Sequence, residues 1–128
     1  MKNISNVIGG LLGLLFLTFG MNFFLKFIPL PPPEEGSAAA LFMSAMYTTG
    51  YLAFVKCLEI VGGILVAIPK TRNYGLLVLG PIIINILAFH VFLAKGGGLF
   101  DPPVVLISLL SLFLLWSGRR AFLGLLNP

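Results

Sequence analysis

Lys56 and Glu59 are the two residues whose types and spacing could do chemistry, because they are ionisable side chains inside an otherwise apolar stretch, Phe54 to Gly63. Three positions apart on a helix, they share one face and lie within reach of each other. An ionisable side chain in hydrocarbon costs roughly 2.5 to 3.5 kcal/mol on insertion scales, so it seldom occurs there without a role. We therefore expect an ion pair or a shared proton that faces neighbouring helices.

The composition predicts an integral membrane protein. Of the 128 residues, 59% are hydrophobic and only 9% are charged, and the mean hydropathy is +1.08. An average soluble domain carries about a quarter charged residues. The net charge of +4 comes from basic residues at the ends of apolar runs, so it indicates membrane topology and not a nucleic-acid surface. Cys57 is the only cysteine, which excludes an intrachain disulfide.

Four apolar runs predict an all-α, integral membrane four-helix bundle that forms a single transmembrane domain over residues 1–128. The expected spans are residues 4–28, 48–68, 74–94 and 103–117. A proline block after the first run begins an outer loop, residues 29–47. Residues 37–47 are too short to span and predict a short amphipathic helix in this loop, with Ser37 able to cap its start. Gly9 and Gly13 form a small-xxx-small pair that lets another helix approach closely.

Positive charges predict the orientation, because cytoplasmic loops are enriched in lysine and arginine. One side of the predicted bundle carries Lys2, Lys70, Arg72, Arg119 and Arg120. The other side carries Glu34, Glu35, Lys95 and Asp101. We therefore expect both termini in the cytoplasm, and we expect the protein in the cytoplasmic membrane of a bacterium.

This orientation places the polar residues of three spans in or near the outer half of the bundle. The expected ligand-binding residues are Lys56, Glu59, Asn85, His90, Asn22 and Lys26. One interpretation is a cavity that opens to the outer side, and the other is a set of structural hydrogen bonds between helices. Lys26 could instead extend to the membrane interface. Asn85 and His90 are about 140° apart around a helix, so both can face the interior only if that face is broad.

The sequence offers few of the residues that other cofactors require. A haem with two histidine ligands needs more than His90, the only histidine. A metal site needs several His, Cys or carboxylate ligands, and the spans offer only Cys57, Glu59 and His90. The sequence also has no phosphate-binding glycine loop and no Ser-His-Asp arrangement. The sequence therefore does not identify a cofactor, and a quinone is the candidate that we consider.

The second and third predicted spans carry two signatures that resemble a known family. Val55 to Leu65 contains the pattern K-x-x-E-x-x-G-G, and Leu79 to His90 contains P-x-x-x-N-x-x-x-x-H. Together they resemble the DoxX-like family of small four-helix integral membrane proteins, and the resemblance covers the chain from end to end. It implies a four-helix bundle. It also implies a link to redox chemistry, because the family name comes from a membrane subunit of a thiosulfate:quinone oxidoreductase and other members are linked to oxidative-stress complexes.

Two functions follow as hypotheses. In the first, the protein is a membrane subunit of a redox system that binds a quinone-like or other small lipophilic ligand. The headgroup would then accept or donate hydrogen bonds with Lys56, Asn85 and His90, and Glu59 would hold Lys56 or pass a proton. In the second, it is a non-enzymatic accessory or assembly protein whose buried polar cluster is structural and whose outer loop binds a membrane protein partner. An enzyme that acts alone is the hypothesis that these residues support least. A transporter with four short helices would require a homo-oligomer.

Overall fold

The computed structural model describes residues 2–29, 32–95 and 98–126, and within these ranges the chain is helical with no strand. The α-helices are α1 (Lys2–Leu25), α2 (Ala38–Thr48), α3 (Tyr51–Ala67), α4 (Arg72–Ala88), α5 (Pro102–Ser117) and α6 (Arg119–Leu123). Three short segments extend or connect them: η1 (Pro69–Thr71), η2 (Phe89–Leu93) and η3 (Gly124–Leu126). The all-α prediction is confirmed.

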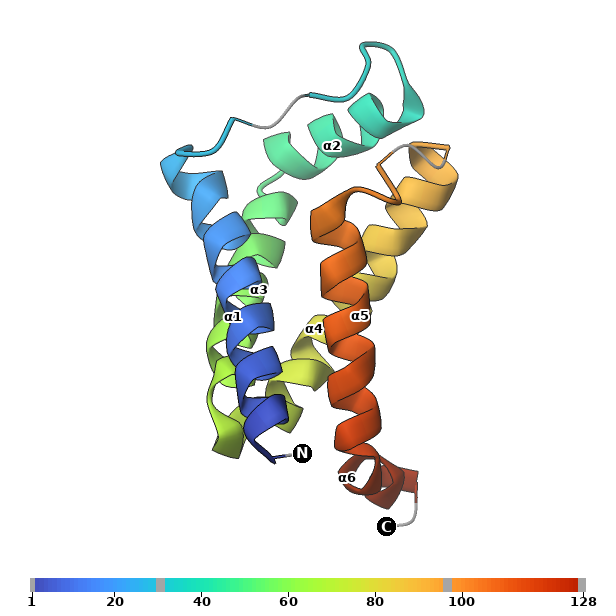
Figure 1. Cartoon of the computed structure of the whole chain (residues 1–128). Coiled ribbons are helices and arrows are strands. Elements are labelled where there is room, and N and C mark those ends of the chain that lie inside the picture. The colour runs from blue at the N-terminus through green and yellow to red at the C-terminus, as the bar shows by residue number, and fades with distance from the viewer. Residues whose placement is uncertain (1, 30–31, 96–97, 127–128) are drawn as a thin grey trace.

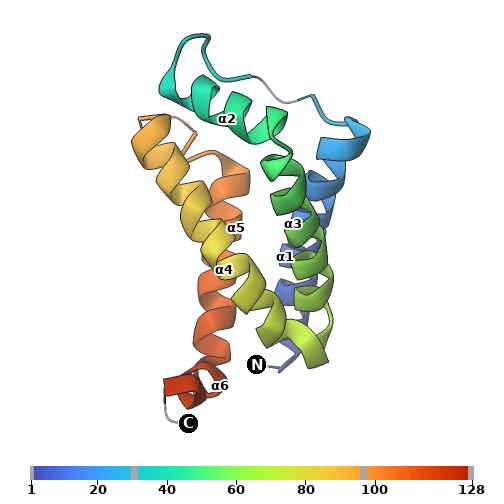
Figure 2. The ribbon, with the colours of Figure 1, turned by 180° about the vertical axis from the view of Figure 1, so that it is seen from behind.

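Four long helices run between the two ends of the molecule, and α2 lies across one of those ends (Figure 1). Helix α3 packs against α1 and α4, while α5 contacts both α1 and α4. Seen from behind, α4 leaves α3 near the η1 turn and crosses toward α5 at the other end (Figure 2). The start of α1 and the α6–η3 segment lie at the end opposite α2 (Figure 1).

Two helical segments, Asn3–Leu25 and Pro69–Leu93, are each long and apolar enough to cross a membrane. Two further candidates are bent pairs, α2 with α3 at 82° and α5 with α6 at 70°. Helix α3 has 17 residues and α5 has 16. They are thus about 25 Å long, against a hydrocarbon core of about 30 Å. The fold therefore contains two spans by length and composition, or up to four if each bent pair forms one.

Two helices stop short of the predicted span bounds at the end where α2 lies, and both differences have local causes. Helix α1 ends at Leu25 and not at residue 28, because Lys26 adopts a left-handed backbone with φ of 54°. Helix α3 begins at Tyr51 and not at residue 48, because Gly50 has φ of 82° and allows the sharp bend from α2. Helix α4 with η2 ends at Leu93, and α5 covers Pro102–Ser117, each within a few residues of its predicted span.

The short helix predicted in the first outer loop is confirmed as α2. The hydroxyl oxygen of Ser37 accepts a hydrogen bond from the Ala40 amide at 3.1 Å, so Ser37 caps the helix as expected. The rings of Phe42 on α2 and Phe89 on η2 lie 5.7 Å apart. Helix α2 therefore contacts both α3 and η2.

Glycines set the close approach of α3 to its two neighbours. A Cβ atom on Gly13 of α1 would lie 2.5 Å from the carbonyl oxygen of Gly63. A Cβ atom on Gly75 of α4 would lie 2.5 Å from the Val66 amide nitrogen and 2.9 Å from the Gly62 carbonyl oxygen. These neighbours are backbone atoms and cannot turn aside, so larger residues would push the helices apart.

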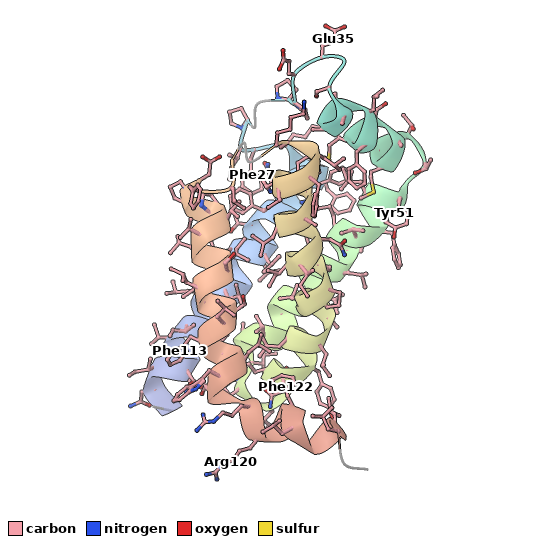
Figure 3. All side chains as sticks on the ribbon, turned by 90° about the vertical axis from the view of Figure 1, so that its right-hand side faces the viewer. Phe27, Glu35, Tyr51, Phe113, Arg120 and Phe122 are labelled. Atoms are coloured by element: carbon pink, nitrogen blue, oxygen red, sulfur yellow. The ribbon has the colours of Figure 1, made fainter. Side chains whose placement is uncertain are left out.

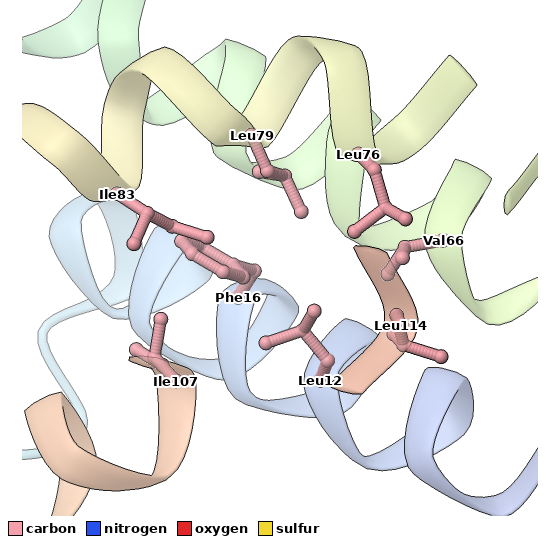
Figure 4. Packing of buried hydrophobic residues seen from close by; sticks show 8 residues of the cluster. All are labelled: Leu12, Phe16, Val66, Leu76, Leu79, Ile83, Ile107 and Leu114. Carbon is pink, nitrogen blue, oxygen red and sulfur yellow. The ribbon is translucent and has the colours of Figure 1, made fainter. Parts of the chain in front are cut away.

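Apolar side chains from α1, α3, α4 and α5 fill the space between the four long helices (Figure 4). The cluster consists of Leu12, Phe16, Val66, Leu76, Leu79, Ile83, Ile107 and Leu114. The outer faces of these helices are apolar as well, since Leu14, Phe54, Ile84 and Leu109 are all exposed. Apolar surface on both the inside and the outside is typical of helices that contact lipid.

Replacing Gly75 by alanine is expected to destabilise the bundle. The added methyl group would meet backbone atoms of α3, and overpacking of this kind costs about 1 to 3 kcal/mol. The matched control is Gly80→Ala on the same helix, where a Cβ atom meets nothing within 4 Å. The control should be neutral or slightly stabilising, because alanine favours helix over glycine. Unfolding titrations in detergent micelles, followed by circular dichroism, measure both, and equal effects would contradict the role assigned to Gly75.

Candidate functional site

The expected ion pair on α3 is confirmed. The Lys56 ammonium nitrogen Nζ lies 3.4 Å from Oε1 of Glu59, and this is the only ion pair among the described residues. Glu59 is only 5% exposed, whereas the Lys56 side chain is 22% exposed. No described residue other than Lys56 donates a hydrogen bond to the Glu59 carboxylate. One carboxylate oxygen is therefore left without a protein donor.

The burial of Glu59 follows from its place on α3. It lies on the same face as Gly62 and Gly63, one turn away from both. A Cβ atom on Gly62 would meet the Leu79 side chain of α4, and one on Gly63 would meet Phe16 of α1. The carboxylate is thus carried on the face that α1 and α4 cover. Helices α3 and α4 diverge toward the end where α2 lies (Figure 2).

Asn22 has its hydrogen bonds at the end of α1. Its amide Nδ2 donates to the Ile28 carbonyl at 3.0 Å, and the Ile28 amide donates to its Oδ1 at 2.6 Å. The side chain is buried, and it ties the chain back after the left-handed turn at Lys26. Lys26 itself is exposed. These two predicted ligand residues therefore build the end of a helix.

Asn85 and His90 point to different sides of the α4–η2 segment, as their spacing suggested. Asn85 is exposed and donates through Nδ2 to the Pro81 carbonyl at 2.8 Å. It is two positions from the buried Ile83 and hence about 160° around the helix from it. His90 is half-buried, and its Nδ1 lies 2.8 Å from the Ile86 carbonyl oxygen. The structure therefore brings Lys56 and Glu59 together, while Asn22, Asn85 and His90 bond their own segments.

Gly98, in the loop before α5, lies beside His90, and no local pattern in the sequence predicts this contact. A Cβ atom on Gly98 would be 3.2 Å from Nε2 of His90 and 3.3 Å from Oδ2 of Asp101. The loop before α5 thus packs its backbone between an imidazole and a carboxylate. In the sequence, Asp101 served as one of the charges that predict the orientation, and its place near His90 depends on the path of the loop.

Arg72 was predicted as a charge that sets topology, and the structure adds a packing role. Its Nε donates to the Val66 carbonyl at 3.0 Å, and its Nη1 donates to Oδ1 of Asn6 at 3.2 Å. The guanidinium lies over Gly9, where a Cβ atom would collide with it. In the expected small-xxx-small pair, Gly13 therefore meets α3, while Gly9 makes room for the side chain of Arg72.

The hollows in the surface lie at the two ends of the molecule. A groove of about 510 Å³ at the α2 end is lined by Pro32, Pro33, Glu35, Ala40, Met43, Ser44, Tyr47, Thr48 and Leu52. A smaller one of about 270 Å³ lies between α4 and the α6–η3 segment. None of the six predicted ligand residues lines either hollow, although Leu52 is two turns from Glu59 on the same face of α3. Among the described residues, no three His, Cys, Asp or Glu side chains come together as metal ligands.

Fold and site define a class: a small all-helical protein with apolar helices long enough to cross a membrane and an ion pair buried between them. No family model and no solved structure matches the chain. It is 32% identical over 124 residues to the uncharacterized protein YwoB of Bacillus subtilis (strain 168), a match that covers 87% of this chain and 77% of that protein. The chain belongs to the same family as YwoB. The DoxX-like resemblance remains a prediction that rests on the two signatures.

Removing the two members of the ion pair should have unequal effects. Lys56→Met leaves the buried carboxylate of Glu59 without its partner, and we expect a loss of about 3 kcal/mol in the free energy of unfolding. Glu59→Gln leaves a lysine that is partly exposed and keeps a hydrogen-bonding side chain, so we expect a loss of about 1 kcal/mol.

A double-mutant cycle with Lys56→Met and Glu59→Gln, measured by unfolding in micelles, checks this asymmetry. The double variant should be more stable than Lys56→Met alone, because no uncompensated carboxylate remains. Additive effects of the two substitutions would contradict the pairing.

Proposed function

We propose that this chain is an integral protein of the bacterial cytoplasmic membrane, with four spans and both termini in the cytoplasm. Its exposed apolar helices and the two bent pairs support four spans. Charge supports the orientation. Glu35 lies at the α2 end and Arg120 at the α6 end, at opposite ends of the bundle (Figure 3). Because cytoplasmic loops are enriched in lysine and arginine, the α6 end would be the cytoplasmic one.

Labelling of single cysteines tests this orientation. In a Cys57→Ser background, Glu35→Cys should react with a membrane-impermeant maleimide added to intact cells. Arg120→Cys is the matched control and should react only after the membrane is permeabilised. Labelling of both positions from the same side of the membrane would refute the four-span topology.

For the function, we propose a membrane subunit of a redox system that binds the polar headgroup of a small lipophilic ligand, a quinone or a molecule like it, at Lys56 and Glu59. The observation that carries the proposal is the Glu59 carboxylate, which is 5% exposed and has Lys56 as its only hydrogen-bond partner among the described residues. A group of this kind inside a membrane protein is by default a candidate functional site.

The chemistry of the pair suits a quinone headgroup. The Lys56 ammonium could donate a hydrogen bond to a quinone carbonyl, and the free oxygen of Glu59 could accept one from a quinol hydroxyl. Lys56 lies nearer the α2 end than Glu59 and is the more exposed of the two. A ligand would therefore meet Lys56 first, entering from the outer end where the groove reaches Leu52.

The alternative is a non-enzymatic accessory or assembly protein in which the pair is structural. One observation favours it: Asn22, Asn85 and His90, which were expected to join a ligand site, bond backbone carbonyls of their own segments. The ion pair would then determine how α3 packs between α1 and α4. Helix α2 and its groove would form the surface that binds a membrane protein partner.

Native mass spectrometry with lipid and quinone extraction separates the two functions. Wild-type protein should release a small lipophilic molecule. Glu59→Gln should lose it and still fold, with the melting temperature lowered only by the several degrees that a loss of about 1 kcal/mol implies. The matched control is Glu34→Gln, which removes the same charge from the exposed outer loop and should keep the ligand. Wild-type protein without any ligand, together with a Glu59→Gln variant that fails to fold, would favour the structural role.

A further inference from the structure

The outward face of α4 is largely uncovered by the rest of the molecule. In the most apolar part of Asn3–Leu25, 33% of the residues are buried inside the molecule, against 17% in Pro69–Leu93. Among the exposed side chains of α4, four follow one another at a spacing of three and four: Tyr74, Leu77, Pro81 and Ile84. Together with the half-buried Ala88, these residues form a seven-residue repeat. Such a repeat is typical of helices that pair in a left-handed supercoil, and we call this row of residues the seam.

Asn85 lies beside this seam with hydrogen-bonding capacity to spare. One N–H of its amide donates to the Pro81 carbonyl, and its Oδ1 accepts no hydrogen bond from any described residue. Pro81 has no N–H, so the carbonyl of Leu77 also lacks its usual helical donor. The outward face thus carries acceptors without donors, although apolar residues surround them.

The depth of Asn85 makes this costly in lipid. It is four residues from the middle of Pro69–Leu93, or about 6 Å along the axis, well inside a hydrocarbon core of about 30 Å. No water is available there to bond a free amide. The cost is removed if a second helix brings a donor and an acceptor to the same depth.

We infer that this face of α4 is a dimer interface with a second copy of the chain, in which the two Asn85 side chains bond to each other. A carboxamide both donates and accepts, so a pair related by a two-fold axis is self-complementary. Two copies inserted in the same orientation place their Asn85 side chains at the same depth. Pro81 and Ala88, one turn to either side, are small enough for the helices to approach. The inference rests on the proposed membrane embedding of α4 and is independent of the proposed ligand.

Disulfide cross-linking in native membranes tests the interface, in a Cys57→Ser background because Cys57 is itself exposed. Ile84→Cys, on the seam, should give a covalent dimer on mild oxidation. The matched control is Leu109→Cys on α5, a residue of similar exposure, at 60% against 67% for Ile84, and it should stay monomeric.

The role of Asn85 is tested by adding Asn85→Leu to the Ile84→Cys protein. Single-molecule photobleaching in vesicles at increasing dilution should then show dimerisation about 5- to 30-fold weaker, the range expected for an interhelical asparagine bond. The melting temperature should not fall, which excludes unfolding as the cause. A dimer unaffected by Asn85→Leu, or cross-linking at Leu109 as strong as at Ile84, would overturn the inference. The mass-spectrometric experiment measures ligand release independently of dimerisation. The dimer interface and the proposed ligand site can therefore fail separately.

Discussion

The close approach of α3 to α1 and α4 is the constraint on which the rest of the structure depends. It is possible because Gly13, Gly63 and Gly75 present backbone where other residues would present side chains. The same face of α3 carries Glu59 one turn further along, so a helix seated in this way must bury the carboxylate. The lysine and glycines of the K-x-x-E-x-x-G-G pattern thus have distinct physical roles. The glycines bring the helices together, and Lys56 compensates the charge that their contact buries.

The sequence predicted the elements better than it predicted their rotation about their own axes. Apolar runs, prolines and Ser37 were enough to locate the helices and α2, and the three-residue spacing was enough to pair Lys56 with Glu59. The direction of Asn85 could not be predicted, because α4 is apolar on nearly every side and has no polar stripe that marks its outer face. The contact of Arg72 with Gly9 joins residues far apart in the chain, so no local pattern announces it.

Polar residues in these apolar helices mostly bond backbone carbonyls within their own segments. His90 and Asn85 do so four residues back, as does Ser108 on α5 with the Val104 carbonyl. Each of these bonds uses one polar atom of a side chain within its own segment, so that bond does not join two helices. Some polar atoms are left without a hydrogen bond from any described residue. One is the free carboxylate oxygen of Glu59, on the inward face of α3, and another is the amide oxygen of Asn85, on the outward face of α4.

The path of α4 explains why these two atoms face different surroundings. Near η1 the helix lies against α3, where Gly62 and Gly75 hold the two together. Further along, α4 crosses toward α5 and away from α3, as Figure 2 shows. Helix α2 then crosses the open end and contacts both α3 and η2. The Lys56–Glu59 pair therefore lies on a helix that close packing against α1 and α4 holds along one side and that α2 contacts at its start.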